Sequence, residues 1–201
     1  MSSYTIIQNT SEELRRRIFN ALASAPDADL NLQNPEADIT FSPPSDQLSN
    51  NLTLSLYLYH IEVNGDLRNQ RRLAVGQSGI RLPPIPLDLR YLVTPLDDTE
   101  TINQLIIGRI VQHFYEEPFL TSLNGTPLDD SFGGSSGQFR IMLESLSIEF
   151  LSQLWSSLNT DFRLAIGYHV RVVPIDTTEV AASKRVSESH AAVGLMTKGN
   201  S

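Results

Sequence analysis

Apolar and polar residues alternate with a period of two along four segments of the chain. The clearest run, LTLSLYLYHIEV, covers residues 52–63, and similar runs cover residues 85–93, 139–143 and 162–172. Successive side chains of a β-strand point to opposite faces, so this period is typical of strands with one buried face. The pattern therefore predicts four strands, and Pro174 is expected to end the last of them.

In three other segments the apolar residues recur at spacings of three and four, which is typical of amphipathic helices. The first stripe lies in residues 12–25 and is expected to stop before Pro26. The second lies in residues 99–117, ahead of Pro118, and the third in residues 147–158, which open with a serine suited to cap a helix. Three helices are therefore predicted.

The predicted order is helix, strand, strand, helix, strand, helix, strand, with one further short strand in ADITF, residues 37–41. This order indicates a single α+β domain in which about three helices cover one mixed, mainly antiparallel sheet. Residues 1–176 are predicted to form the domain. Residues 177–201 are small and polar and lack periodic apolar positions, so they are expected to be a flexible tail.

The stretch RLPPIPLDLRYLVTPL, residues 81–96, combines prolines with a strand pattern. Prolines lack the amide donors of a sheet ladder, which favours a sheet edge or the entrance of a strand. Asp88 and Arg90 alternate with the apolar positions and are expected to face away from the core, toward solvent or a neighbouring subunit. The basic, weakly periodic residues 66–84 are predicted to form a long loop that can hold a short hairpin.

The composition excludes several classes of protein. The chain has 201 residues, which fits one domain, and a formal net charge of −8, which argues against a nucleic-acid binder. It has no cysteine, which excludes disulfides, thiolate catalysis and cysteine-ligated zinc. We find no secretory-signal pattern, and no apolar run approaches the ~20 residues of a membrane span. The expectation is a protein made in the cytoplasm, with no membrane span and no nucleic-acid partner.

No group of residues combines the spacing of a catalytic or cofactor-binding motif with the structural context that the motif needs. Residues 133–137, GGSSG, formally match the G-x-S-x-G pattern around Ser135. That nucleophile turn needs a buried strand before it and a helix after it, whereas here polar residues precede it and a strand is predicted to follow. None of the four histidines has metal-ligand spacing: His60, His113, His169 and His190. We expect no catalytic residue, no metal and no cofactor.

Basic residues gather in the loop between the first two long strands of an otherwise acidic chain. They are Arg68, Arg71, Arg72 and Arg81. Two interpretations stay open: a solvated loop, or a patch that complements an acidic protein partner, since charge contrast steers docking. With Lys184 and Arg185 of the predicted tail, these arginines are the candidate protein-interaction residues.

Four segments, taken in order, resemble a known family. They are LSLYLYHIEVNGDLRNQ, PPIPLDLRYLVTPL, LIIGRIVQHFY and LWSSLNTDFRLAIGYHVRVVPID, within residues 54–176. Their hydrophobic patterns are similar to those of the N-terminal domain family of the cap, or tail-terminator, protein of phage-tail-like contractile injection systems. The resemblance covers roughly residues 3–176 and consists of many diffuse patterns rather than of a few invariant residues.

The resemblance implies a structural, non-enzymatic role with a tail-terminator-like fold. Members of that family are expected to form a hexameric ring on the distal end of the inner tube and sheath, where the ring ends polymerisation and stabilises the last layer. The implied partners are further copies of the chain and the tube and sheath proteins. The basic loop and the tail are the segments expected to reach these partners.

Three alternatives stay open beside the cap. One is a phage-like head-to-tail connector or completion protein, which uses a similar ring. Another is a monomeric binding module that uses the arginine loop, and the third is a small serine hydrolase that uses Ser135. A ring predicts about six associated chains, or assembly only with partners, whereas the module and the hydrolase predict a monomer.

Overall fold

The computed structural model covers the domain and part of the predicted tail. It describes residues 3–25, 30–45, 48, 52–67, 73–75, 79–81, 83–128, 138–175 and 180–182. For residue 3, residue 172 and the segments 73–75, 79–81 and 180–182, the description is limited to the backbone. None of the helices in these residues is long and apolar enough to cross a membrane.

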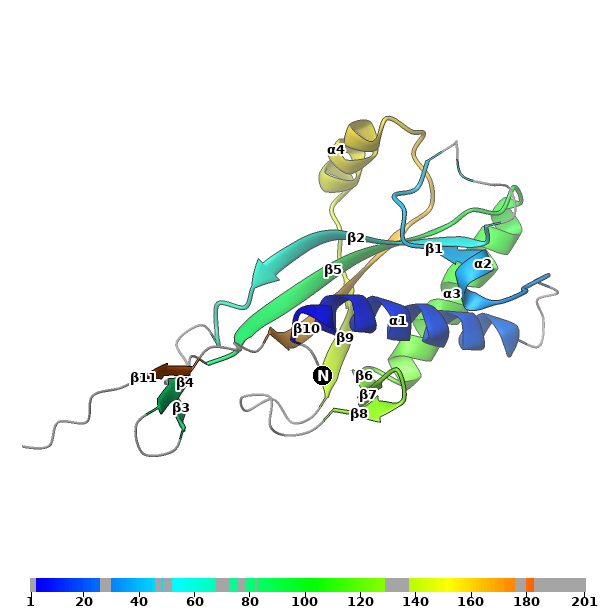
Figure 1. Ribbon diagram of the computed structural model, residues 1–201. Coiled ribbons are helices and arrows are strands. Elements are labelled where there is room, and N and C mark those ends of the chain that lie inside the picture. The colour runs from blue at the N-terminus through cyan, green and yellow to red at the C-terminus, as the bar shows by residue number, and fades with distance from the viewer. Residues whose placement is uncertain are drawn as a thin grey trace, which may run out of the picture.

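A six-stranded sheet forms the centre of the molecule (Figure 1). Its strands, in spatial order, are β1 (Ile39–Thr40), β2 (Leu54–Val63), β5 (Ile85–Pro95), β10 (Ile166–Ile175), β9 (Phe139–Glu144) and β6 (Phe119–Leu120). Only β1 and β2 pair in parallel, and the other neighbours in this sheet are antiparallel. The predicted α+β class with a mixed, mainly antiparallel sheet is therefore confirmed.

Two long helices cover one face of this sheet, and a third helix stands over the other face (Figure 1). The covering helices are α1 (Ile6–Ala23), preceded by the short η1 (Ser3–Thr5), and α3 (Glu100–Glu116). The helix on the opposite face is α4 (Ile148–Leu158), and the Ser147 side chain caps it by accepting from the Phe150 amide, as the sequence predicts. A one-turn helix that the sequence analysis did not predict, α2 (Pro35–Asp38), precedes β1.

Two small sheets complete the described backbone. β3 (Leu73–Val75), β4 (Gly79–Arg81) and β11 (Val180–Ala182) form a three-stranded sheet beyond the end of β5 and β10 (Figure 1). The β3–β4 pair confirms the short hairpin predicted within the basic loop, and the flexibility predicted for residues 177–201 stays a prediction. β7 (Ser122–Leu123) and β8 (Thr126–Pro127) form a tight hairpin, in which Asn124 and Gly125 have positive φ angles of 49° and 76°.

The main core lies between the sheet and the helices α1 and α3. The apolar side chains at its centre are at most 4% exposed, and they include Leu14, Ile18, Leu56, Leu89, Tyr91, Val93, Ile106, Ile110, Phe114 and Val170. The hydroxyls of Tyr91 and Ser11 are hydrogen-bonded at 2.8 Å, which satisfies the polar end of a fully buried tyrosine. The helix stripes and strand faces predicted from the sequence supply this core.

The last strand differs from its prediction at both ends. β10 begins at Ile166, so Phe162 precedes it and is 60% exposed. Pro174 lies inside β10, opposite Pro86 of the central strand β5. The Asn64 amide donates to the Pro86 carbonyl at 2.8 Å, so the backbone polar groups of Pro86 point toward β2. The two prolines are therefore a non-hydrogen-bonded pair, and their missing amides remove no bond between β5 and β10.

Candidate functional site

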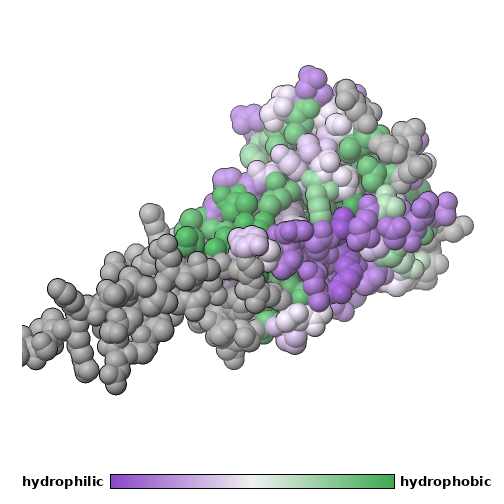
Figure 2. All heavy atoms as spheres, in the orientation of Figure 1, coloured by the Kyte–Doolittle hydropathy of each residue, from purple (hydrophilic) through white to green (hydrophobic). Residues whose placement is uncertain are grey.

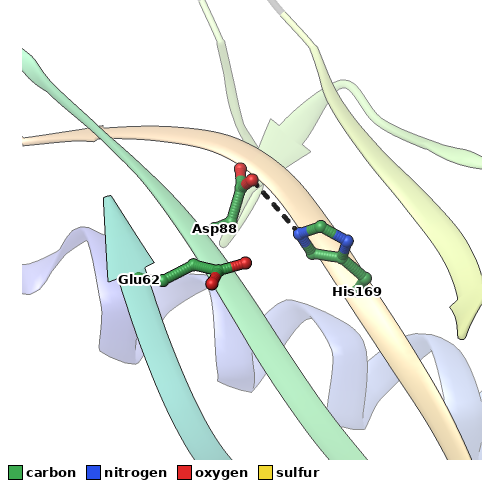
Figure 3. A group of neighbouring side chains, drawn as sticks. All are labelled: Glu62, Asp88 and His169. Carbon is green, nitrogen blue, oxygen red and sulfur yellow. Dashed lines mark ion pairs between the residues drawn. The ribbon is translucent and has the colours of Figure 1, made fainter. Parts of the chain in front are cut away.

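The most concentrated polar group lies on the sheet face that α1 and α3 leave uncovered. Glu62, Asp88 and His169 come from the neighbouring strands β2, β5 and β10, and their side chains converge (Figure 3). One carboxylate or imidazole atom from each lies within 4.8 Å of the others. Glu62 is the register partner of Asp88, which explains why two residues far apart in the sequence share this place.

Asp88 is the buried centre of this group, at 4% exposure. It accepts a hydrogen bond from Asn64 Nδ2 at 2.9 Å, and His169 Nε2 lies 3.3 Å from Asp88 Oδ2. Arg171 Nε lies 3.5 Å from the same oxygen. The sequence analysis placed Asp88 and Arg90 on the correct face but left them available to solvent or a neighbouring subunit. For Asp88 the predicted access to solvent or a neighbouring subunit is wrong, because partners from the neighbouring strands enclose its carboxylate.

Arg90 joins a second set of partners beside Asp88. Its Nε donates to Glu62 Oε1 at 3.1 Å, and its guanidinium also forms an ion pair with Glu144 of β9. The Tyr59 hydroxyl donates to Glu144 at 3.0 Å. These contacts connect β2, β5 and β9, and with His169 and Arg171 of β10 the polar and charged groups of four strands form one network. We name this network the polar cluster.

Burial and charge set the protonation of the cluster. Burial lowers the pKa of His169 and outweighs the opposite effect of the Asp88 carboxylate, so the imidazole is neutral at pH 7. The hydrogen bond from Arg90 lowers the pKa of Glu62, which stays ionised. Burial raises the pKa of Tyr59, so its hydroxyl keeps the proton that it donates to Glu144.

The chemistry of the cluster favours a structural role over a metal centre or a catalytic site. A neutral imidazole beside two carboxylates is a donor set that divalent cations accept. However, the guanidinium of Arg90 already donates to the Glu62 carboxylate, and that of Arg171 lies close to Asp88. A divalent cation at this place would therefore meet two fixed positive charges. The Asp88 carboxylate is also too buried, at 4% exposure, for a substrate to reach it. The contacts of the cluster instead link the neighbouring strands β2, β5, β10 and β9.

A pocket lies between the polar cluster and α4. Its volume is about 670 Å³, and its lining includes Tyr59, His60, Arg90, Leu146, Phe150 and Leu154. The rings of Tyr59 and Phe150 are 5.7 Å apart and close one side of it. The pocket thus has a charged floor on the sheet and an apolar wall on the helix.

The candidate interaction residues predicted from the sequence lie almost entirely outside the described residues. This holds for Arg68, Arg71, Arg72, Lys184 and Arg185, and also for Ser135 of the GGSSG segment. Arg81 is described by its backbone alone, as the β4 residue that pairs with β3 and β11. Their proposed roles remain predictions. The structure does fix where the basic loop begins, because Asn64 Oδ1 accepts from the amides of Asp66 and Leu67.

Two solved structures share the fold. One is the PVC sheath/tube terminator of an extracellular contractile injection system in its extended state, with a TM-score of 0.60 and 16% identity over 95% of this chain and 64% of that chain. The other is the tube-terminating cap of the anti-feeding prophage, with a TM-score of 0.55 and 18% identity over 92% of this chain and 60% of that chain. This chain therefore spans less than two thirds of either protein. No curated protein matches it.

A protein-family comparison covers nearly the whole chain. The family described as Pvc16 N-terminal domain matches residues 9–189. The matched segment contains the complete six-stranded sheet, α3 and α4, most of α1 and the small sheet formed by β3, β4 and β11. The resemblance to a cap-protein N-terminal domain that the sequence suggested is confirmed, and the chain belongs to the Pvc16 N-terminal domain family.

Proposed function

We propose that this protein is the cap, or tail terminator, of a contractile injection particle and has no enzymatic activity. The observation that supports the proposal is the family match over residues 9–189, together with a fold shared with two terminators of such particles. In this role the protein binds the distal end of the inner tube and sheath, ends their polymerisation and stabilises the last layer. It assembles in the cytoplasm and remains part of the finished particle.

The proposed assembly is a ring of six copies. A ring forms when each copy contacts the next through two different surfaces and the rotation between copies closes. Such a ring can present one face to the last tube and sheath layer and leave no addition site on the other. The polar cluster suits a structural protein that must stay rigid, because its side-chain contacts link four paired strands of the sheet.

The proposed contacts with tube and sheath use the basic residues identified from the sequence. In this proposal Arg68, Arg71, Arg72 and Arg81 of the loop, with Lys184 and Arg185, bind acidic surfaces of those partners. The chain carries a formal net charge of −8, so basic residues concentrated in one loop contrast with the rest of the molecule. A variant with Arg68→Glu, Arg71→Glu and Arg72→Glu is expected to fold normally and to be lost from particles.

A charge reversal on another part of the molecule is the control. Arg140→Glu alters an exposed arginine on β9, and the variant is expected to join particles like the wild type. Truncation after Ala182 removes Ser183–Ser201 while keeping β11, and it tests whether the end of the chain is needed. Normal incorporation of both the triple-arginine variant and the truncated chain would refute the proposed contacts.

Electron microscopy of particles assembled with and without the protein tests the function itself. The expected result is a ring at one end of each particle when the protein is present. Without it, tubes should lack this ring and vary in length. Capped particles of uniform length in the absence of the protein would overturn the proposal, and a ring located at another junction would favour a connector instead.

A further inference from the structure

An exposed apolar surface lies where the sheet extends past α1. Ile61 and Val63 at the end of β2 are 43% and 49% exposed, and Ile85 at the start of β5 is 52% exposed. Their register partners Leu89, Leu87 and Ile175 belong to the core face or pack against it, so all three point to the face that α1 covers farther along. Figure 2 shows hydrophobic surface gathered at this end of the sheet. We name these three residues the strand tip.

A second exposed apolar surface belongs to α4 and the segment after it. Ile148 is 75%, Phe162 60% and Leu164 38% exposed, whereas Phe150, also 38% exposed, lines the pocket between α4 and the sheet. Trp155 anchors the helix from its inner side at 2% exposure, and its ring lies 6.1 Å from that of Phe162. The exposed residues are therefore held in place rather than loosely attached. We name Ile148, Phe162 and Leu164 the α4 surface.

The two surfaces lie at separate places on the molecule. The strand tip lies at the end of β2 and the start of β5, and its register partners place it on the α1 side of the sheet. The helix α4 stands over the opposite face (Figure 1). Apolar side chains exposed together usually mark an interaction site. Two such sites in different places suit a heterologous contact, in which one surface of a copy meets the other surface of the next.

The charge of the chain supports apolar surfaces as the contact between copies. With a formal net charge of −8 each, two copies repel one another at long range, and burial of apolar area offsets this repulsion when they meet. We propose that the strand tip of one copy docks on the α4 surface of the next copy. This inference rests on the proposed ring, and it names the two surfaces that close the ring.

The absence of cysteine from the chain makes this contact directly testable. Single cysteines are introduced as Val63→Cys in the strand tip, and as Ile148→Cys or Phe162→Cys at the two ends of the α4 surface. Particles carrying the full-length variants are treated with a short bismaleimide, and the products are separated on a denaturing gel. All three positions are exposed, so the variants are expected to fold.

The expected result depends on how the variants are combined. A chain with Val63→Cys and one α4-surface cysteine should give a ladder of cross-linked copies that stops at the ring size. A mixture of the two single variants should give dimers, and each single variant alone should give none. Gln104→Cys on the exposed side of α3, paired with Ile148→Cys, is the control and should stay unlinked.

Three outcomes would overturn the inference. In the first, Val63→Cys alone links to itself as strongly as the mixture does, which indicates a symmetric tip-to-tip contact. In the second, Val63→Cys links to a tube or sheath protein. In the third, neither α4-surface cysteine links to Val63→Cys in particles that are capped. In the last two cases the particles still contain the cap, so the inference fails while the proposed function stands. The proposed function itself is refuted only if the wild-type chain is absent from the particles.

Discussion

Removal of the Asp88 carboxylate tests whether the polar cluster stabilises the fold. In Asp88→Ala the buried Asn64 Nδ2 loses its acceptor, which costs about 1–3 kcal/mol for an unsatisfied buried donor. Arg171 is 36% exposed and also reaches Asp66 at 3.3 Å, so losing its ion pair with Asp88 costs less than about 1 kcal/mol. Removing a buried charge offsets part of this, because the carboxylate no longer has to be desolvated. We expect a net loss of about 2 kcal/mol.

Urea unfolding followed by far-UV circular dichroism measures this loss as a change in the free energy of unfolding. For a chain of this size, a loss of about 2 kcal/mol corresponds to a melting temperature lower by about 4–8 °C. Asp88→Asn retains one oxygen that can accept from Asn64, and about half the loss is expected. Asp98→Ala removes an exposed carboxylate and serves as the control, with an expected change within about 0.5 kcal/mol.

A double-mutant cycle assigns the effect to the buried hydrogen bond. Asn64→Ala and Asp88→Ala are combined, and a coupling energy of about 1 kcal/mol or more is expected, since a hydrogen bond to a charged group contributes about 1.5–3 kcal/mol. If Asp88→Ala costs less than about 0.5 kcal/mol and the coupling is zero, the reasoning is refuted. The cluster would then be a set of contacts without net stabilisation.

Three further predictions concern stability. Burial holds the folded-state pKa of His169 below its usual 6.5, so the stability contributed by the neutral imidazole is present above pH 6.5 and is lost as pH falls through the lowered value. Urea midpoints at pH 7.5 and 5.5 measure this loss. His169→Gln should reduce it and leave the part due to His113, whose pKa burial also lowers, and an unchanged difference between the midpoints would contradict the prediction. Trp155 is the single tryptophan, and its helix α4 lies outside the main core cluster. Tryptophan fluorescence should therefore change at a lower urea concentration than the circular dichroism signal. Coincident transitions would show that α4 unfolds with the core. The new Cβ of Gly108→Ala in α3 meets no atom within 4 Å, so this substitution should stabilise the fold by about 1 kcal/mol. The new Cβ of Gly167→Ala lies 2.9 Å from Leu146 Cδ1, so that substitution should destabilise the fold. Thermal melts of the two variants measure whether the melting temperature rises for the first and falls for the second.

Local patterns were sufficient to predict most of the elements. The alternation in residues 54–63 and 85–95 and the helical stripes of α1, α3 and α4 depend on neighbours in the sequence. These elements are close to their predicted bounds, except that α1 begins at Ile6, six residues before the predicted stripe. The start of β10 could not be predicted in this way, because alternation continues through Phe162 although no neighbouring strand pairs with that residue. Pairing partners, rather than periodicity, decide where a strand begins.

The polar cluster escaped prediction because it depends on one extra residue in β2. Strict alternation from Leu58 would place His60 and Glu62 on the core face. The register shifts between Leu58 and His60, so Glu62 moves to the opposite face beside Asp88, and Ile61 and Val63 take the core face. The sequence carries a trace of this bulge, since the apolar positions change from even to odd numbers after Leu58. The partner of Glu62, however, follows only from the register between β2 and β5.

The same bulge places the polar cluster directly behind the strand tip, and this connects the stability of the site to the proposed contact between copies. Val63 pairs with Leu87 on one face, while Glu62 and Asp88 meet on the other. The strands extend past α1 at this end, so no long helix covers the tip, and the cross-strand ion pairs hold its strands together. Asp88→Asn should therefore lower the yield of the cross-link between Val63→Cys and Ile148→Cys in a chain that remains folded, and Asp98→Ala should leave it unchanged. If Asp88→Asn cross-links as well as the parent variant, the cluster stabilises the domain without shaping the contact surface.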